Sequence, residues 1–85
     1  MEKARPVVLL VEDDESTAHL YSIKLKMDGY RVDIARDAAT AGLLFDRSRP
    51  DVVCVDTRLP DGSGRDVVTP LGGRGSAVIL LTTAQ

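Results

Sequence analysis

The chain has 85 residues, a net charge of −2 and an apolar fraction of 44%, values typical of one small globular domain. Acidic and basic residues are interspersed along it, so no basic face indicates nucleic-acid binding. Lys24, Lys26 and Arg31 are expected on a solvated helix face. No segment approaches the roughly 20 apolar residues of a membrane span, and the charged N-terminus lacks the apolar stretch of a signal peptide. We therefore expect a soluble, cytoplasmic domain without membrane contact.

The first half of the chain alternates strand and helix signals. The apolar run Val7–Val11 predicts a strand, and Ser16 is expected to cap a helix that ends at Gly29. That helix carries three large apolar residues at helical spacing: Leu20, Ile23 and Met27. Residues 30–35 alternate apolar and charged side chains, which predicts a strand with one wetter face.

A second helix and two further strands are expected after this. Asp37 can cap a helix that carries Ala41, Leu44 and Phe45 and ends before Pro50. The most apolar run, Val52–Val55, predicts a central strand, and Val78–Leu81 predicts the last one. Between them we expect a turn-rich loop over 57–64 and a short helix from about Arg65, since proline and glycines follow.

The resulting βαβαβαβ order predicts an α/β fold with a doubly wound parallel sheet. The single cysteine, Cys54, lies in the middle of a predicted buried strand, so we expect it to serve packing. His19 is expected to be an exposed residue of the first helix.

Polar residues follow three of the predicted strands directly. Glu12, Asp13 and Asp14 follow the first strand, Asp56 the third, and Thr82 and Thr83 the last. Parallel strands bring their carboxyl ends to one edge of the sheet, where ligands bind. Clustered carboxylates suit Mg²⁺ or Mn²⁺, and an aspartate beside such a metal can act as a nucleophile toward phosphorus. Acids after strands are also common as solvated turn residues, so spacing alone leaves both readings open.

Three motifs resemble the receiver domain of bacterial two-component response regulators: Val8–Glu15, Pro50–Asp56 and Leu59–Gly64. The resemblance covers the chain in order. It implies a flavodoxin-like sheet with strand order 2-1-3-4-5 and a signal-transduction module that is not an enzyme in its own right.

The resemblance also implies a role for each acid. Asp56 corresponds to the residue that a histidine kinase or phosphotransfer protein phosphorylates. The implied ligands of Mg²⁺ (or Mn²⁺) are Glu12, largely through water, Asp13, Asp56 and the backbone carbonyl of Arg58. The switch hydroxyl stays open between two neighbours: four preceding apolar residues favour Thr82, whereas a Thr-Ala pair frequent in the family favours Thr83.

The resemblance stops at Gln85, so we expect a receiver truncated after its fourth strand. A receiver continues through a fourth helix, a fifth strand ending in a lysine that pairs with the phosphoryl group, and a fifth helix. Lys3, Lys24 and Lys26 lie in the wrong elements to replace that lysine. The alternative expectation is therefore a phosphorylation-deficient module that dimerises or docks, with self-association through its exposed last strand. A phosphatase of the aspartyl-phosphate type would need further acids and a cap domain.

Overall fold

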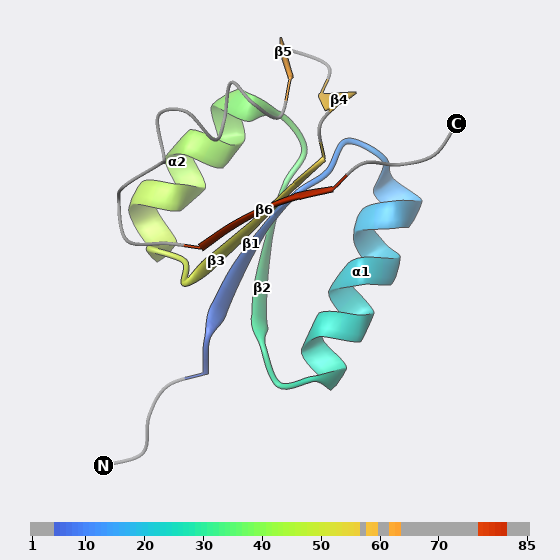
Figure 1. Ribbon diagram of the computed structural model, residues 1–85, viewed down its shortest axis with the longest axis vertical. Coiled ribbons are helices and arrows are strands. Elements are labelled where there is room, and N and C mark those ends of the chain that lie inside the picture. Colours follow the sequence, from blue (N-terminus) through green and yellow to red (C-terminus); the bar gives the residue numbers. More distant parts are fainter. Residues whose placement is uncertain (1–4, 57, 60–61, 64–76, 82–85) are drawn as a thin grey trace.

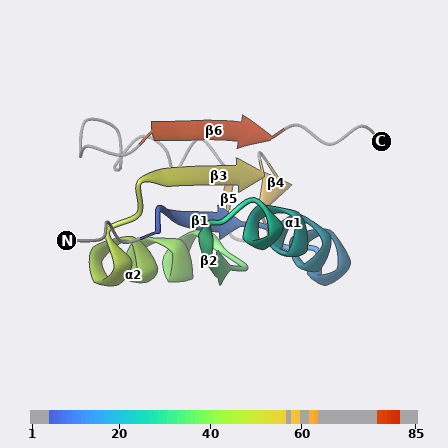
Figure 2. The ribbon, with the colours of Figure 1, turned by 90° about the horizontal axis from the view of Figure 1, so that it is seen from below.

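The structure is a computed structural model that describes residues 5–56, 58–59, 62–63 and 77–81. Four parallel strands form one sheet: β1 (Val7–Val11), β2 (Arg31–Ala35), β3 (Val52–Asp56) and β6 (Ala77–Leu81). Two helices, α1 (Glu15–Met27) and α2 (Ala38–Ser48), lie on opposite faces of that sheet (Figures 1 and 2). The described residues contain no helix long and apolar enough to cross a bilayer.

The strand order is β2-β1-β3-β6, as the resemblance implied for the first four parallel strands. The third strand is confirmed as an interior strand, since β3 pairs with β1 on one side and with β6 on the other. The expected third helix lies outside the described residues. The expected loop after Asp56 contains a short antiparallel pair instead, β4 (Arg58–Leu59) with β5 (Gly62–Ser63).

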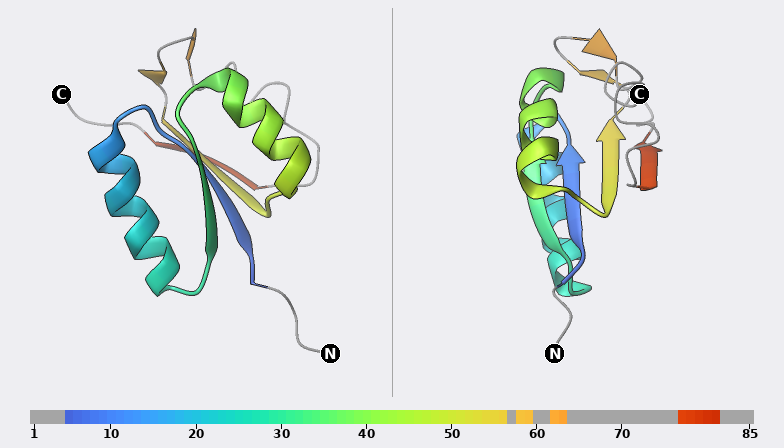
Figure 3. Two further views of the ribbon diagram at one scale, coloured as in Figure 1. Left: turned by 180° about the vertical axis from the view of Figure 1, so that it is seen from behind. Right: turned by 90° about the vertical axis from the view of Figure 1, so that its left-hand side faces the viewer.

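The face of the sheet under α2 holds the core. Successive strand residues point to opposite faces, so Leu9 and Val11 of β1 share this face with Val53 and Val55 of β3. All four side chains are fully buried and pack with Phe45 and other residues of α2. This confirms the expected apolar face of the second helix, and Figure 3 shows α2 running alongside the strands at this face of the sheet.

The opposite face lies under α1 and is covered less evenly. Val8 and Leu10 of β1 are buried there, whereas Val52 and Cys54 of β3 are only half-buried. Cys54 is therefore only partly buried, although it lies in the strand that was predicted to be buried. The partial burial that remains still raises the pKa of its thiol, because the thiolate loses hydration.

Helix α1 begins and packs differently from the prediction. Its N-cap is Asp14, not Ser16, because the Asp14 side chain accepts a hydrogen bond from the backbone N–H of Thr17. Its buried residues are small, Ala18 and Ser22. The predicted apolar stripe faces solvent, with exposed fractions of 65% for Leu20, 44% for Ile23 and 77% for Met27. Helical spacing placed the large apolar residues on one side of α1. The opposite side meets the sheet, because its small residues Ala18 and Ser22 let the helix approach more closely.

The remaining helix boundaries follow the sequence signals. Gly29, just beyond α1, has a φ of 97°, a conformation that glycine adopts without steric cost. Asp37 is confirmed as the N-cap of α2. That helix ends at Ser48, and Arg49 takes the left-handed conformation before Pro50. These caps fix the directions in which the chain enters and leaves each strand.

Candidate functional site

Two carboxylates from distant parts of the chain meet at the carboxyl edge of the sheet. Val11 of β1 is in register with Val55 of β3, so the next residues, Glu12 and Asp56, leave their strands at the same level. Both side chains are buried, with exposed fractions of 2% and 6%. Parallel pairing thus brings together the first acid after β1 and the last residue of β3.

The surroundings of Glu12 disfavour its charged form. Burial is the largest cause and raises the pKa of Glu12, and a side-chain hydrogen bond with Asp56 raises it further. A smaller effect opposes this, because the backbone N–H of Asp14 donates to Glu12 Oε2 at 3.1 Å. The other oxygen, Oε1, is buried and has no hydrogen-bond partner among the described residues. The hydrogen bond between the two acids requires that one of them carry a proton. When both are ionised, Oε1 has no donor among the described residues, and a cation would offset its buried charge.

This pair fits the donor chemistry of a hard divalent cation. Buried charges are otherwise costly, and carboxylate oxygens are the ligands that Mg²⁺ takes in proteins. In the described part of the chain, no three or more His, Cys, Asp or Glu side chains group closely enough to hold a metal ion. The structure therefore brings together two of the expected ligands and does not show the whole set.

The other predicted site residues are placed less completely. Asp13 is exposed and directly follows Glu12 at the same edge. Arg58 lies in β4, where its backbone is in register with Ser63 of β5. Thr82 and Thr83 lie outside the described residues.

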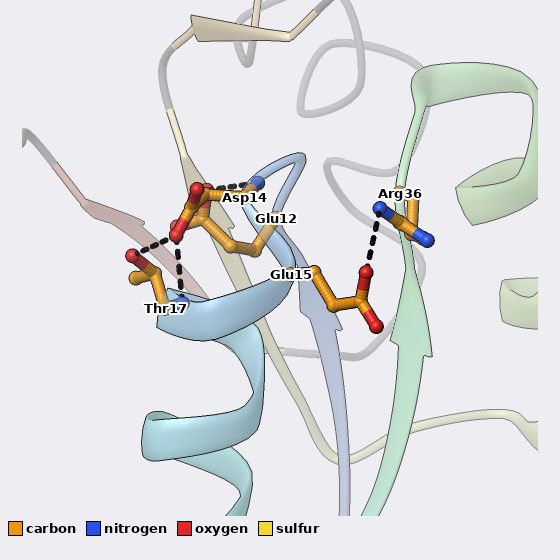
Figure 4. A network of polar contacts seen from close by, with 5 residues as sticks. All are labelled: Glu12, Asp14, Glu15, Thr17 and Arg36. Atoms are coloured by element: carbon orange, nitrogen blue, oxygen red, sulfur yellow. Dashed lines mark hydrogen bonds and ion pairs between the residues drawn. The ribbon is translucent and has the colours of Figure 1, made fainter.

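Asp14 has a role that the acidic motif did not reveal. Its Oδ2 accepts from the backbone N of Thr17 at 2.8 Å and from Thr17 Oγ1 at 2.6 Å (Figure 4). These hydrogen bonds lower the pKa of Asp14. The available signal was the Asp-x-x-Thr spacing, which recurs in α2, where the Asp37 side chain accepts from the backbone N of Thr40 at 2.7 Å. Asp37 was expected as a cap from its position before the second helix, whereas the cap of the first helix was expected at Ser16, two residues after its true position.

A separate surface groove of about 580 Å³ lies between α1 and β2. It is lined by Glu15, Ser16, Ala18, His19, Ile34 and Arg36. Glu15 and Arg36 approach each other across it at 3.7 Å, and both side chains are largely exposed (Figure 4). His19 is exposed, as expected, and it lies at this groove.

The fold and the paired acids agree with comparisons to known proteins. A family model described as the response regulator receiver domain matches residues 8–85. The chain belongs to the response regulator receiver family. It is therefore a signal-transduction domain of the two-component type, a kind of domain that is typically a non-enzymatic signalling module and typically binds Mg²⁺.

Individual relatives support the same assignment. The chain is 37% identical over 78 residues to the sensory transduction protein RegX3 of Mycobacterium tuberculosis and 32% identical over 85 residues to the DNA-binding response regulator MtrA of Mycolicibacterium smegmatis. These alignments cover 92% and 100% of this chain but only 34% and 37% of those proteins. The non-phosphorylated HemR receiver domain from Leptospira biflexa is 35% identical, with a TM-score of 0.84 over 92% of this chain and 64% of that one.

Proposed function

We propose that this receiver domain accepts a phosphoryl group on Asp56 from a histidine kinase or phosphotransfer protein. The observation that carries the proposal is the buried Glu12–Asp56 pair, in which Glu12 Oε1 has no partner among the described residues. Two buried acids in contact are unfavourable for stability alone. A positively charged ligand at the carboxyl edge of the parallel sheet would offset this cost.

The transfer needs few protein groups. An oxygen of the Asp56 carboxylate attacks phosphorus, the bond from phosphorus to the imidazole nitrogen of the donor breaks, and the imidazole keeps that electron pair. Glu12, Asp13, Asp56 and the carbonyl of Arg58 would hold Mg²⁺. When bound, the metal neutralises charge on the phosphoryl oxygens.

The charge state of Glu12, beside the acceptor, is the property of the site that a bound cation would change. The Asp56 carboxylate is the nucleophile, and burial together with a hydrogen bond to Asp56 favours the neutral form of the neighbouring Glu12. A bound cation would instead favour the ionised form of Glu12. We propose Thr82 as the switch hydroxyl that responds to the phosphoryl group, with Thr83 as the alternate. Substituting each threonine in turn decides between them, because a normal phosphorylation-dependent response without Thr82 would rule it out.

A small-molecule phosphodonor tests the acceptor directly. The chain is incubated with the donor and Mg²⁺, its intact mass is measured, and the modified residue is located by peptide mapping. We expect one phosphoryl group on Asp56 and none in Asp56→Asn. Modification at another residue, or an unmodified wild-type chain that remains folded, would contradict the proposal.

One observation favours a second function, a dimerisation or docking module that does not transfer phosphate. Within the described sheet, β6 has a strand neighbour on one side only, and an exposed edge readily pairs with another chain. Beryllofluoride with Mg²⁺ separates the two functions. A saturable adduct supports the acceptor, whereas absence of the adduct together with a concentration-dependent dimer in sedimentation supports the docking module.

A further inference from the structure

We infer that Thr17 is a positioning residue for the cation site, acting through Asp14 on Glu12. The inference rests on the proposed function, because it assumes that the Glu12–Asp56 pair binds a divalent cation. It concerns a residue outside the acidic motif, on the first turn of α1. Thr17 itself contacts neither acid of that pair in any hydrogen bond found, so its effect is indirect.

The hydrogen bonds form a continuous path from the helix to the site (Figure 4). Thr17 donates twice to Asp14 Oδ2, from its backbone N at 2.8 Å and from its hydroxyl at 2.6 Å. The backbone N–H of Asp14 donates in turn to Glu12 Oε2 at 3.1 Å. Asp14 is thus fixed to the helix by its side chain and to Glu12 by its main chain.

This path determines which part of Glu12 is available. The Asp14 N–H occupies Oε2, and Oε1 remains buried without a partner among the described residues. A carboxylate held by one oxygen has less rotational freedom, so less entropy is lost when the other oxygen binds a cation. Loosening the helix cap lets the Asp14 N–H move and removes this preorganisation, as loss of outer partners does at other metal sites.

The chain contains a matched control for this cap. The N-cap of α2 has the same spacing, with the Asp37 side chain accepting from Thr40. The same contacts also lower the pKa of both capping aspartates. No hydrogen bond found joins Asp37 to Glu12. A change at Thr40 therefore reproduces the loss of a cap hydroxyl without affecting the path to Glu12.

The test compares Thr17→Val with Thr40→Val, two uncharged and nearly isosteric substitutions. Affinity is measured for the metal alone, with free Mn²⁺ followed by electron paramagnetic resonance and Mg²⁺ by calorimetry. We expect both variants to lose a similar amount of thermal stability. We expect the Kd to rise roughly fivefold in Thr17→Val, below the roughly 10- to 100-fold typical of direct outer partners, and to stay unchanged in Thr40→Val.

Each outcome decides a different point. If the wild-type chain binds neither metal, the proposed cation site itself fails. If the wild type binds and both valine variants bind equally well, Thr17 only caps the helix and the inference is wrong. Should Thr17→Val fail to fold, Thr17→Ser and Thr17→Ala provide the same comparison: the serine variant should match the wild-type Kd and the alanine variant should not, and equal affinities would again overturn the inference.

Discussion

The two faces of the sheet are built from the same strands but are buried to different extents. On the α2 face, Val53 and Val55 of β3 are fully buried together with Phe45. On the α1 face, Val52 and Cys54 of the same strand remain half-buried. All four strand residues are apolar or nearly so, hence the strand sequence does not distinguish the faces. What covers each face determines its contribution to stability.

The largest expected effect is a difference in stability between a variant of α2 and a variant of α1. Phe45→Ala should lower the free energy of unfolding by about 3–4 kcal/mol, because it leaves a cavity in the closed core. Met27→Ala, at a side chain that is 77% exposed, should change it by no more than about 0.5 kcal/mol. Urea unfolding followed by circular dichroism measures both. Equal losses would mean that the outer side of α1 is covered in solution.

Neighbouring residues of β3 sharpen the comparison. Val53→Ala should cost about 2–3 kcal/mol, since it removes a fully buried side chain from the α2 face. Val52→Ala, one residue earlier and half-buried, should cost about 1 kcal/mol. The same urea titration applies to both. A larger loss at Val52 would reverse the assignment of the closed and open faces.

The carboxyl edge behaves unlike either face, because burial there opposes folding. The folded state raises the pKa of Glu12. With respect to this group, the folded protein is most stable below the pKa that Glu12 has in the unfolded chain, and it loses that stability as the pH rises through the pKa of Glu12 in the folded state. The side chain introduced by Glu12→Gln stays neutral. At pH 7 without metal, the free energy of unfolding of this variant should therefore exceed that of the wild type by about 1 kcal/mol. Its stability should also depend less on pH. Addition of Mg²⁺ should stabilise the wild type and not the variant.

Destabilisation by Glu12→Gln at neutral pH without metal would contradict this account of the edge. Gly substitutions or deletions are unsuitable controls, because they alter the β1–α1 connection. Asp13→Asn is the matched control. It removes a neighbouring charge from an exposed side chain and should leave the metal-free pH dependence close to that of the wild type.

The smallest expected effect lies at the rim between α1 and β2. Arg36 and Glu15 form an ion pair at 3.7 Å, with exposed fractions of 59% and 83% for their side chains. Water and salt screen such a pair, so Arg36→Ala should change stability by less than about 0.5 kcal/mol. A loss above 1 kcal/mol in a thermal melt would show that this rim contributes more than its exposure suggests.

The sequence predicted most of the described fold, because its signals were local. Apolar runs located β1, β3 and β6, and alternation of apolar and charged residues located β2. Asp37 located the start of α2, and Ala41 and Phe45 located its buried side. The side of α1 that meets the sheet could not be predicted the same way. The large apolar residues of α1 face solvent, while the small residues Ala18 and Ser22 are buried. This outcome depends on tertiary packing and not on helical periodicity.

The candidate site was predictable in part for the same reason. Parallel strands were expected to bring Glu12 and Asp56 to one edge, and the register of β1 with β3 places both residues at the same level there. The different positions of the three acids after β1 could be seen only in the structure: Glu12 is buried, Asp13 is exposed and Asp14 caps α1. Consecutive acids look alike in sequence, whereas the turn between strand and helix sends each side chain in a different direction.

The central claim is that Glu12 and Asp56 form one cation-binding pocket. Carbon-13 resonances of the side-chain carboxyl groups, followed by nuclear magnetic resonance during a Mg²⁺ titration, test it most directly. We predict that the Glu12 and Asp56 resonances shift together along a single binding curve, while that of Asp46 on α2 does not move. If only one of the two responds, or if they follow different curves, the shared pocket is contradicted.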